Sequence, residues 1–243
     1  KMEPHVNAMG ALFSPSTGII NCHQLMLQLL TDIEHKGGLF VAQTCVTSVC
    51  RHPQGFMVKT KGKAGEPYQF QTSHLINAAG LGAQTLAENI EGLSYHYTPQ
   101  LHLCKGSYFG LAGKSPFQHL IYPVPDSSGA GLGIHATLDL GGQVKFGPNT
   151  RYLSSLDYQV EEESKVQFEK AIKRYYPGLD STQLTPAFAG IRPKLQGPND
   201  DFKDFVIQTE IEHGIPGLIQ LFGIESPGLT SCLAIGEKVN SLL

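Results

Sequence analysis

Five polar residues in the middle and later sequence have side chains suited to acid–base chemistry on a carboxylate. Each follows or interrupts an apolar stretch, and they are His135, Arg192, Lys105, Tyr108 and Tyr122. Histidine titrates near neutral pH and serves as a general base, whereas arginine holds a carboxylate with two parallel hydrogen bonds. Together these groups could bind a carboxylate substrate and remove its proton. Taken singly, each one is more typical of a surface residue or a hydrogen-bonded core residue than of a functional one.

A run of small residues suggests a second place where a ligand could approach. In "LINAAGLGAQ", Ala78, Ala79 and Gly80 follow an apolar strand at its carboxyl end. Ligands of open α/β sheets bind at that end of the strands, and small side chains let the backbone approach them closely. An ordinary strand-to-helix turn is the alternative interpretation of this motif.

A third feature is the start of the last helix, within "LFGIESPGLTSCLAIG". The strand ends at Gly223, and the pair Ser226-Pro227 predicts a helix start in which serine caps and proline takes the first position. Because Gly228 has no side chain, the N–H groups behind it would remain open, and such an end binds anions. A plain capped helix is the alternative.

The dinucleotide fingerprint G-x-G-x-x-G is absent from the chain. The nearest match, "GAGLG" at 129–133, has Ile134 where the last glycine is required. The residues after it, "HATLDL", have the pattern of a strand, whereas the fingerprint opens a helix.

Composition excludes several classes of function. The chain has 243 residues, 41% of them hydrophobic, and a net charge of −3 with no run of like charge, which argues against a nucleic-acid or anionic-membrane partner. No apolar stretch approaches the roughly 20 residues of a membrane span. The ten histidines form no metal-type pair, so no metal site is predicted, and the five cysteines form no C-x-x-C. We therefore expect a reducing, cytoplasmic location.

Helices and strands must position these residues. Their order along the chain predicts an α+β protein of two interleaved domains. Asn21 should cap an amphipathic helix, and three strands at 39–49, 55–61 and 68–72 should form an antiparallel meander. Further strands fill the middle section. The clearest helix should run from about Tyr158 to Tyr176, with its acidic first turns exposed to solvent.

Seven stretches occur together in a recognisable order. They are "GALFSPSTGIIN", "LINAAGLGAQTLA", "KGSYF", "LIYPVPD", "GLGIHATLDLGGQVKFGPN", "AGIRPKL" and "GIESPGLTSCLAIG". In these the chain resembles the FAD-dependent D-amino-acid-oxidase-like superfamily, most of all its L-2-hydroxyglutarate dehydrogenase branch. The resemblance implies an incomplete α/β FAD-binding portion of Rossmann type at 22–98, including the meander 51–72, and at 188–243. It also implies an antiparallel β-sheet substrate domain at 99–187 together with 1–21.

The resemblance also implies roles for residues. Members oxidise a carbon bearing a hydroxyl or amine and pass the hydride to flavin N5. In this role His135 would be the base that removes the proton of the substrate hydroxyl. Arg192 would bind the carboxylate of a small substrate, with Lys105, Tyr108 and Tyr122 as further candidates. The FAD contacts would be Val46, Ala78, Ala79, Gly80, Gly190, Gly223, Ile224, Glu225, Ser226, Gly228, Leu229 and Thr230. Oxygen or a quinone would accept the electrons.

One departure from the family pattern bears on FAD binding. Members begin with a strand, G-x-G-x-x-G and a helix, which this chain does not contain, so we expect an upstream region and weak FAD binding without it. Two alternatives stay open at this point. One is an amine or amino-acid oxidase of the glycine-oxidase type, and the other is a non-catalytic binding or scaffold protein.

Overall fold

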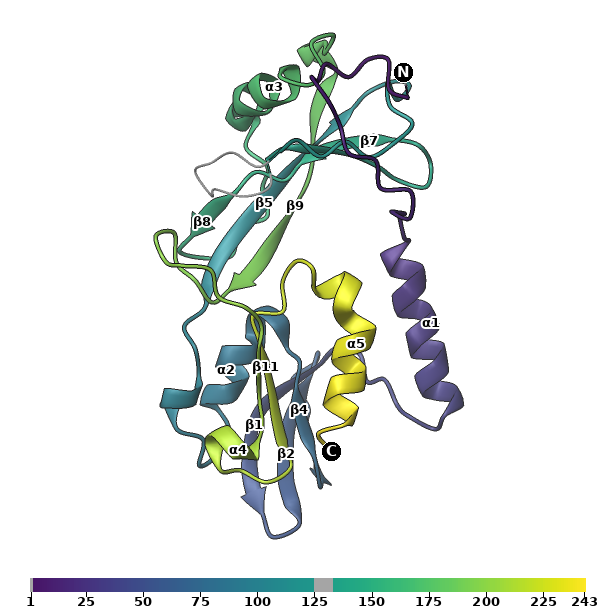
Figure 1. Cartoon of the computed structure of the whole chain (residues 1–243). Helices are drawn as coiled ribbons and strands as arrows, with labels where there is room; N and C mark the ends of the chain where they lie inside the picture. Colours follow the sequence, from purple (N-terminus) through teal and green to yellow (C-terminus); the bar gives the residue numbers. More distant parts are fainter. Residues whose placement is uncertain (1, 125–132) are drawn as a thin grey trace. The chain divides into compact units, whose positions relative to one another are not determined.

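The computed structural model describes residues 2–124 and 133–243 (Figure 1). Of the glycine-rich stretch 129–133, only Gly133 lies within the described residues. The chain divides into two compact units. The first comprises Lys1–Phe40 and Lys105–Ile191, and the second comprises Val41–Cys104 and Arg192–Leu243. The structure combines helices with antiparallel sheets, and this confirms the predicted mixture of α and β structure.

The first unit is built on a five-stranded sheet. Its strand order is β6-β7-β5-β8, with β9 also paired to β5, and the bounds are β5 His102–Leu111, β6 His135–Leu138, β7 Val144–Gly147, β8 Arg151–Leu153 and β9 Leu184–Lys194. Strand β7 is antiparallel to both β5 and β6. Helix α3 (Lys165–Lys173) buries Phe168 and Ile172 against Phe109 and Phe146 of the sheet. One face of this sheet is therefore the core of the unit.

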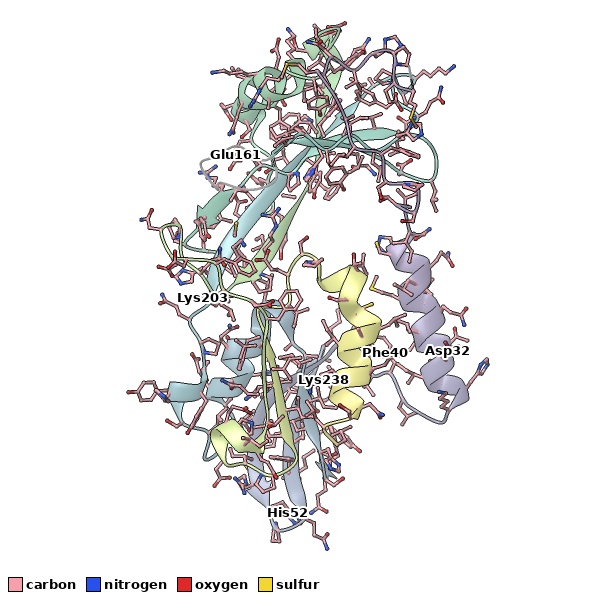
Figure 2. The ribbon with its side chains drawn as sticks, in the orientation of Figure 1. Asp32, Phe40, His52, Glu161, Lys203 and Lys238 are labelled. Atoms are coloured by element: carbon pink, nitrogen blue, oxygen red, sulfur yellow. The ribbon has the colours of Figure 1, made fainter. Side chains whose placement is uncertain are left out.

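Helix α3 is shorter than the sequence predicted. A 3₁₀ turn, Glu162–Ser164, precedes it, and Glu161 has an extended backbone. The predicted helix over residues 158–176 is therefore wrong at its start. The reason is tertiary, because side chains before the 3₁₀ turn, including Glu161 (labelled in Figure 2), bond to Lys105 on β5.

Helix α1 (Cys22–His35) begins where the sequence predicted. The Asn21 side chain accepts a hydrogen bond from the backbone N–H of Gln24 at 3.1 Å, which confirms the cap. None of the fourteen residues of α1 is buried. The compact units place α1 with the first unit, while its predicted membership of an FAD-binding portion stays a prediction.

The second unit contains the predicted meander. Strands β1 (Thr44–His52), β2 (Gly55–Gly62) and β3 (Pro67–Thr72) form an antiparallel sheet in that order. The first strand begins later than expected, at Thr44 rather than at residue 39. A bulge between Val46 and Ser48 interrupts the β1–β2 register. The buried side chains Val49, Phe56 and Val58 of the meander pack against Leu218, which belongs to a second sheet of this unit.

That other sheet has the layered arrangement of an α/β protein. Its order is β10 (Val206–Gln208), β11 (Leu218–Phe222) and β4 (Leu75–Asn77), with β11 parallel to β4 and antiparallel to β10. Every residue of β11 is buried, as expected of a strand covered on both faces. Helix α5 (Gly228–Asn240) runs alongside β11 in Figure 1 and packs Val239 against it. Helix α2 (Ala83–Glu88) packs against Phe222, and the short α4 spans Glu210–His213.

Candidate functional site

The sheet of the first unit has a second face, which α3 does not cover and which we call the open face. Ala136, Val144 and Phe146 belong to the core that α3 shares. Because side chains alternate along a strand, their neighbours His135 and Lys145 point to the other side. The candidate base His135 is therefore on the open face, and Lys145 joins it there.

His135 is held closely by its neighbours although it lies on this face. It is 6% exposed, and its ring packs edge-on against Tyr122, with 4.3 Å between centroids and 69° between planes. The chain segment of Tyr122 is fixed by a bridge between Ile121 and Ala136. Two residues that the sequence predicted separately, the base and a phenol, are thus brought together.

Tyr108 lies in the same row of the sheet as His135. His135 pairs with Gly147 across β6 and β7, and the β5–β7 register places Tyr108 next to that glycine. Gly147 has φ +143°, and a Cβ there would lie 2.7 Å from Tyr108 Cδ1. The Tyr108 ring stacks on Phe188 of β9, with centroids 4.5 Å apart and planes 13° apart. Glycine is therefore required between the two predicted residues.

Lys105 differs from the other candidates because it lies on the core face. It is 0% exposed, and its Nζ donates to Asp157 Oδ2 at 2.8 Å, the Gln159 carbonyl at 2.8 Å and Glu161 Oε1 at 3.0 Å. Burial lowers the pKa of Lys105, but the bonds to the two carboxylates outweigh it and raise the pKa above its ordinary value. All three N–H donors of the ammonium are in use. None is left for a substrate carboxylate.

Arg192 belongs to the second unit, where an acidic partner holds it. Its Nε lies 3.8 Å from Glu225 Oε2, and Nη1 lies 3.9 Å from the buried Cys104 sulfur. Lys194, two residues further on, bonds the other oxygen of Glu225 at 2.5 Å. The Glu225 side chain is 11% exposed. This carboxylate therefore ties the end of β9 to the turn before α5.

The turn after β4 is pinned by a buried amide pair. Asn77 is fully buried and donates to the Ala83 carbonyl at 2.8 Å and to Gln220 Oε1 at 2.6 Å, while its own oxygen accepts from the Ala79 N–H at 3.3 Å. The predicted FAD contacts Ala78, Ala79 and Gly80 are exposed. At Gly80, which has φ +57°, no atom lies within 4 Å of the place that a Cβ would take. The turn is thus rigid and its outer surface is open.

The turn before α5 corrects one prediction. The N-cap of α5 is Pro227, and no side chain caps it, so the predicted cap by Ser226 is wrong. The N–H of Gly228 donates to the Glu225 carbonyl, so it is not open either. The exposed Leu229 and Thr230 remain as candidates for an open N–H.

The remaining predicted FAD contacts differ in their surroundings. Gly223 has φ +69°, and a Cβ there would lie 2.6 Å from the Leu195 side chain, so glycine is required. Gly190 is exposed on β9 with nothing within 4 Å of a Cβ position. Val46 and Ile224 are half-buried, in the β1 bulge and in the turn after β11.

Comparison with protein families identifies the chain. The FAD dependent oxidoreductase family, DAO, matches residues 1–242. The chain belongs to this family. No helix in the described part of this DAO-family chain is long and apolar enough to cross a membrane.

Several named relatives share the sequence along almost all of its length. The chain is 37% identical to the mitochondrial L-2-hydroxyglutarate dehydrogenase of Arabidopsis thaliana over 98% of this chain and 57% of that protein. It is 27% identical to the L-2-hydroxyglutarate dehydrogenase of Escherichia coli K12 over 99% of this chain and 64% of that protein. The DAO-family chain thus spans about three fifths of the length of these relatives.

Solved structures show the same fold. The FAD-bound L-alpha-glycerophosphate oxidase of Mycoplasma pneumoniae superimposes with a TM-score of 0.65 at 24% identity, covering 82% of this chain and 50% of that one. Glycine oxidase from Bacillus cereus gives a TM-score of 0.61 at 16% identity, over 82% of this chain and 48% of that one. At these identities the likeness concerns the DAO fold alone.

Sequence reasoning missed two members of the open face, Lys145 and Phe188, and it missed the ion pair that Lys194 forms with Glu225. A signal for Lys145 was present. In "QVKFGP" the apolar Val144 and Phe146 flank it, and strict alternation places the lysine on the opposite face. Nothing comparable marks Lys194, whose partner lies 31 residues away.

Proposed function

We propose that the native full-length protein containing this chain is an FAD-dependent dehydrogenase of small 2-hydroxy acids, with L-2-hydroxyglutarate or a close analogue as substrate. The observation that carries the proposal is the open face, where a nearly buried histidine packs against a tyrosine and stands beside a required glycine. The 37% identity to an L-2-hydroxyglutarate dehydrogenase supports this choice of substrate.

We propose that two turns of the second unit, the one after β4 and the one before α5, would contact the cofactor. Small, exposed residues at 78–80 and the start of α5 at Leu229 and Thr230 suit a flat group that needs close backbone approach and N–H donors. These residues fit part of FAD. The chain itself lacks the G-x-G-x-x-G that would cradle the pyrophosphate. When bound, FAD would supply the acceptor for the hydride that leaves the substrate carbon.

The residues of this chain would supply the proton chemistry and the orientation. We assign to His135 the removal of the hydroxyl proton, because imidazole accepts protons near neutral pH and its ring is fixed by Tyr122. The family resemblance predicts Arg192 of the second unit as a carboxylate-binding residue, and Glu225 restrains the direction of its guanidinium. Tyr108 and Tyr122 would offer phenol donors. Oxygen or a quinone would reoxidise the flavin, and reoxidation rates in air and with a soluble quinone distinguish the two.

The test uses the native full-length protein. A flavin absorption spectrum should be present, and L-2-hydroxyglutarate should bleach it under anaerobic conditions. Bleaching by glycine or D-amino acids and not by hydroxy acids would replace the proposal with an amine oxidase. A colourless protein that takes up no added FAD would support a binding or scaffold role.

A further inference from the structure

Lys145 is a second cation near the proposed base, and the strand register fixes its place. It pairs with Thr137 across β6 and β7, while His135 pairs with Gly147 two positions along the same ladder. Both side chains leave the sheet on the open face, because Val144 and Phe146 point into the core. Diagonal neighbours of this kind lie about 7–8 Å apart. Lys145 is therefore one step along the sheet from the base.

The ammonium of Lys145 keeps donors for another partner. Nζ lies 3.3 Å from Asp139 Oδ2, and both side chains are more than a third exposed, so this pair is weak. Asp139 is fixed independently, since its Oδ1 accepts the backbone N–H groups of Gly141 and Gln143 at 2.9 and 3.0 Å. Of the three donors of an ammonium, Asp139 takes one.

An aromatic surface lies beneath this ammonium. Lys145 Nζ is 5.9 Å from the centroid of the Phe188 ring, and Phe188 in turn stacks on Tyr108. Phe188 is 48% exposed, so its ring is available to an apolar part of a ligand. The open face therefore offers a base, an apolar surface and a cation.

We propose that Lys145 is a specificity-determining residue that binds the carboxylate remote from the carbon that is oxidised. This inference rests on the proposed function, because it takes His135 to act at the hydroxyl. A hydroxy acid with a methylene chain and a second carboxylate matches these three groups, since His135 would act at its hydroxyl, Phe188 would contact its methylenes and Lys145 would bind its remote carboxylate. A monocarboxylate of the same length gains nothing from Lys145, which then stays with Asp139. Selection for dicarboxylates follows from this difference.

The experiment compares two substrates and two variants of the native full-length protein. The substrates are L-2-hydroxyglutarate and L-2-hydroxypentanoate, which has the same five carbons and a methyl group in place of the remote carboxylate. Lys145→Met removes the charge at similar length, and Lys145→Arg retains it. Lys145→Met should raise KM for the dicarboxylate about 10- to 100-fold with kcat nearly unchanged, because a charge-assisted hydrogen bond is lost. Its kcat/KM for the monocarboxylate should stay within about twofold, and Lys145→Arg should retain most of the preference.

Two results overturn the inference alone: an unchanged KM for the dicarboxylate in Lys145→Met, or an equal loss for both substrates. Circular dichroism and flavin absorbance confirm that the variant has folded. If the wild-type protein oxidises no 2-hydroxy acid, the proposed function fails, and the inference fails with it. The wild-type measurement alone therefore tells the two failures apart.

Discussion

Lys105 and Lys145 lie on opposite faces of the same sheet and differ in almost every property. Lys105 is fully buried under the segment before α3 and uses all three of its donors. Lys145 is partly exposed and shares one donor with a carboxylate that the backbone already holds. The same type of side chain has all its donors engaged on one face and keeps donors for another partner on the other. What covers each face, more than residue type, decides the role.

The largest expected effect concerns the base of the open face. His135→Ala in the native full-length protein should reduce the rate of flavin reduction by L-2-hydroxyglutarate about 10²–10⁴-fold, because the proton acceptor is lost. The flavin spectrum should be retained. Anaerobic stopped-flow measurement of flavin bleaching gives the rate, and an unchanged rate would remove His135 from this role.

The next prediction tests the core face. Lys105→Met should lower the free energy of unfolding by about 3 kcal/mol, because it removes the three hydrogen bonds of a buried ammonium, each worth about 1 kcal/mol or more. Lys145→Met is the matched control and should cost well under about 1 kcal/mol, since its pair is exposed. Urea unfolding followed by circular dichroism measures both. Equal losses in the two variants would abolish the distinction between the faces.

The pH dependence of stability should reflect the ion pairs that Lys105 forms with Asp157 and Glu161. The bond to Lys105 holds the pKa of Asp157 and of Glu161 below their usual values of 3.8 and 4.5, while the pKa of Lys105 itself is raised above 10.5. The carboxylates therefore stabilise the fold above about pH 4.5, and this stability is lost as the pH falls through their lowered values. The contribution of Lys105 is present below about pH 10.5 and is lost as the pH rises through its raised value.

Urea unfolding between about pH 3 and 11 checks this dependence. As far as this cluster is concerned, the stability of the wild type should be flat between about pH 4.5 and pH 10.5 and should fall below and above that range. Lys105→Met should flatten both slopes. If the variant keeps the wild-type profile, other groups control the pH dependence.

The smallest expected effect concerns Asp139, the partner of Lys145 on the open face. Asp139→Asn removes the charge that pairs with Lys145, but the amide oxygen can still accept the N–H groups of Gly141 and Gln143. Stability should stay close to that of the wild type. KM for L-2-hydroxyglutarate should fall modestly, because Lys145 no longer has a competing partner. A rise in KM would indicate that Asp139 orients the lysine for binding.

Much of the fold could be predicted because local patterns specify it. The meander, the Asn21 cap and the strand before the "NAAG" turn follow from alternation and from capping chemistry, which act over a few residues. The start of α3 could not be predicted in this way. Asp157 and Glu161, just before and within its predicted first turn, accept hydrogen bonds from Lys105, which lies 52 and 56 residues earlier in the chain. This tertiary contact overrides helix propensity.

The candidate site divides in the same manner. Residue types marked His135, Tyr108, Tyr122 and Arg192 as able to act on a carboxylate, but only the register of β5, β6 and β7 brings His135 and Tyr108 into one row across Gly147. The predicted Ser226 cap failed because Pro227 takes that position and the Glu225 carbonyl engages the next N–H. The local signal of Ser-Pro was correct to within one residue about where the helix starts and wrong about what caps it.

By itself, the sequence determined the family, most of the strands and which residue types could act on a carboxylate, because these depend on residue type and short-range order. Only the tertiary structure decided which face of the sheet each lysine occupies and whether its donors are free. Alternation separates the two sides of a strand, but it does not say which side a helix will cover. That depends on α3 and on residues 157–161, which pack on β5 from a distant part of the chain.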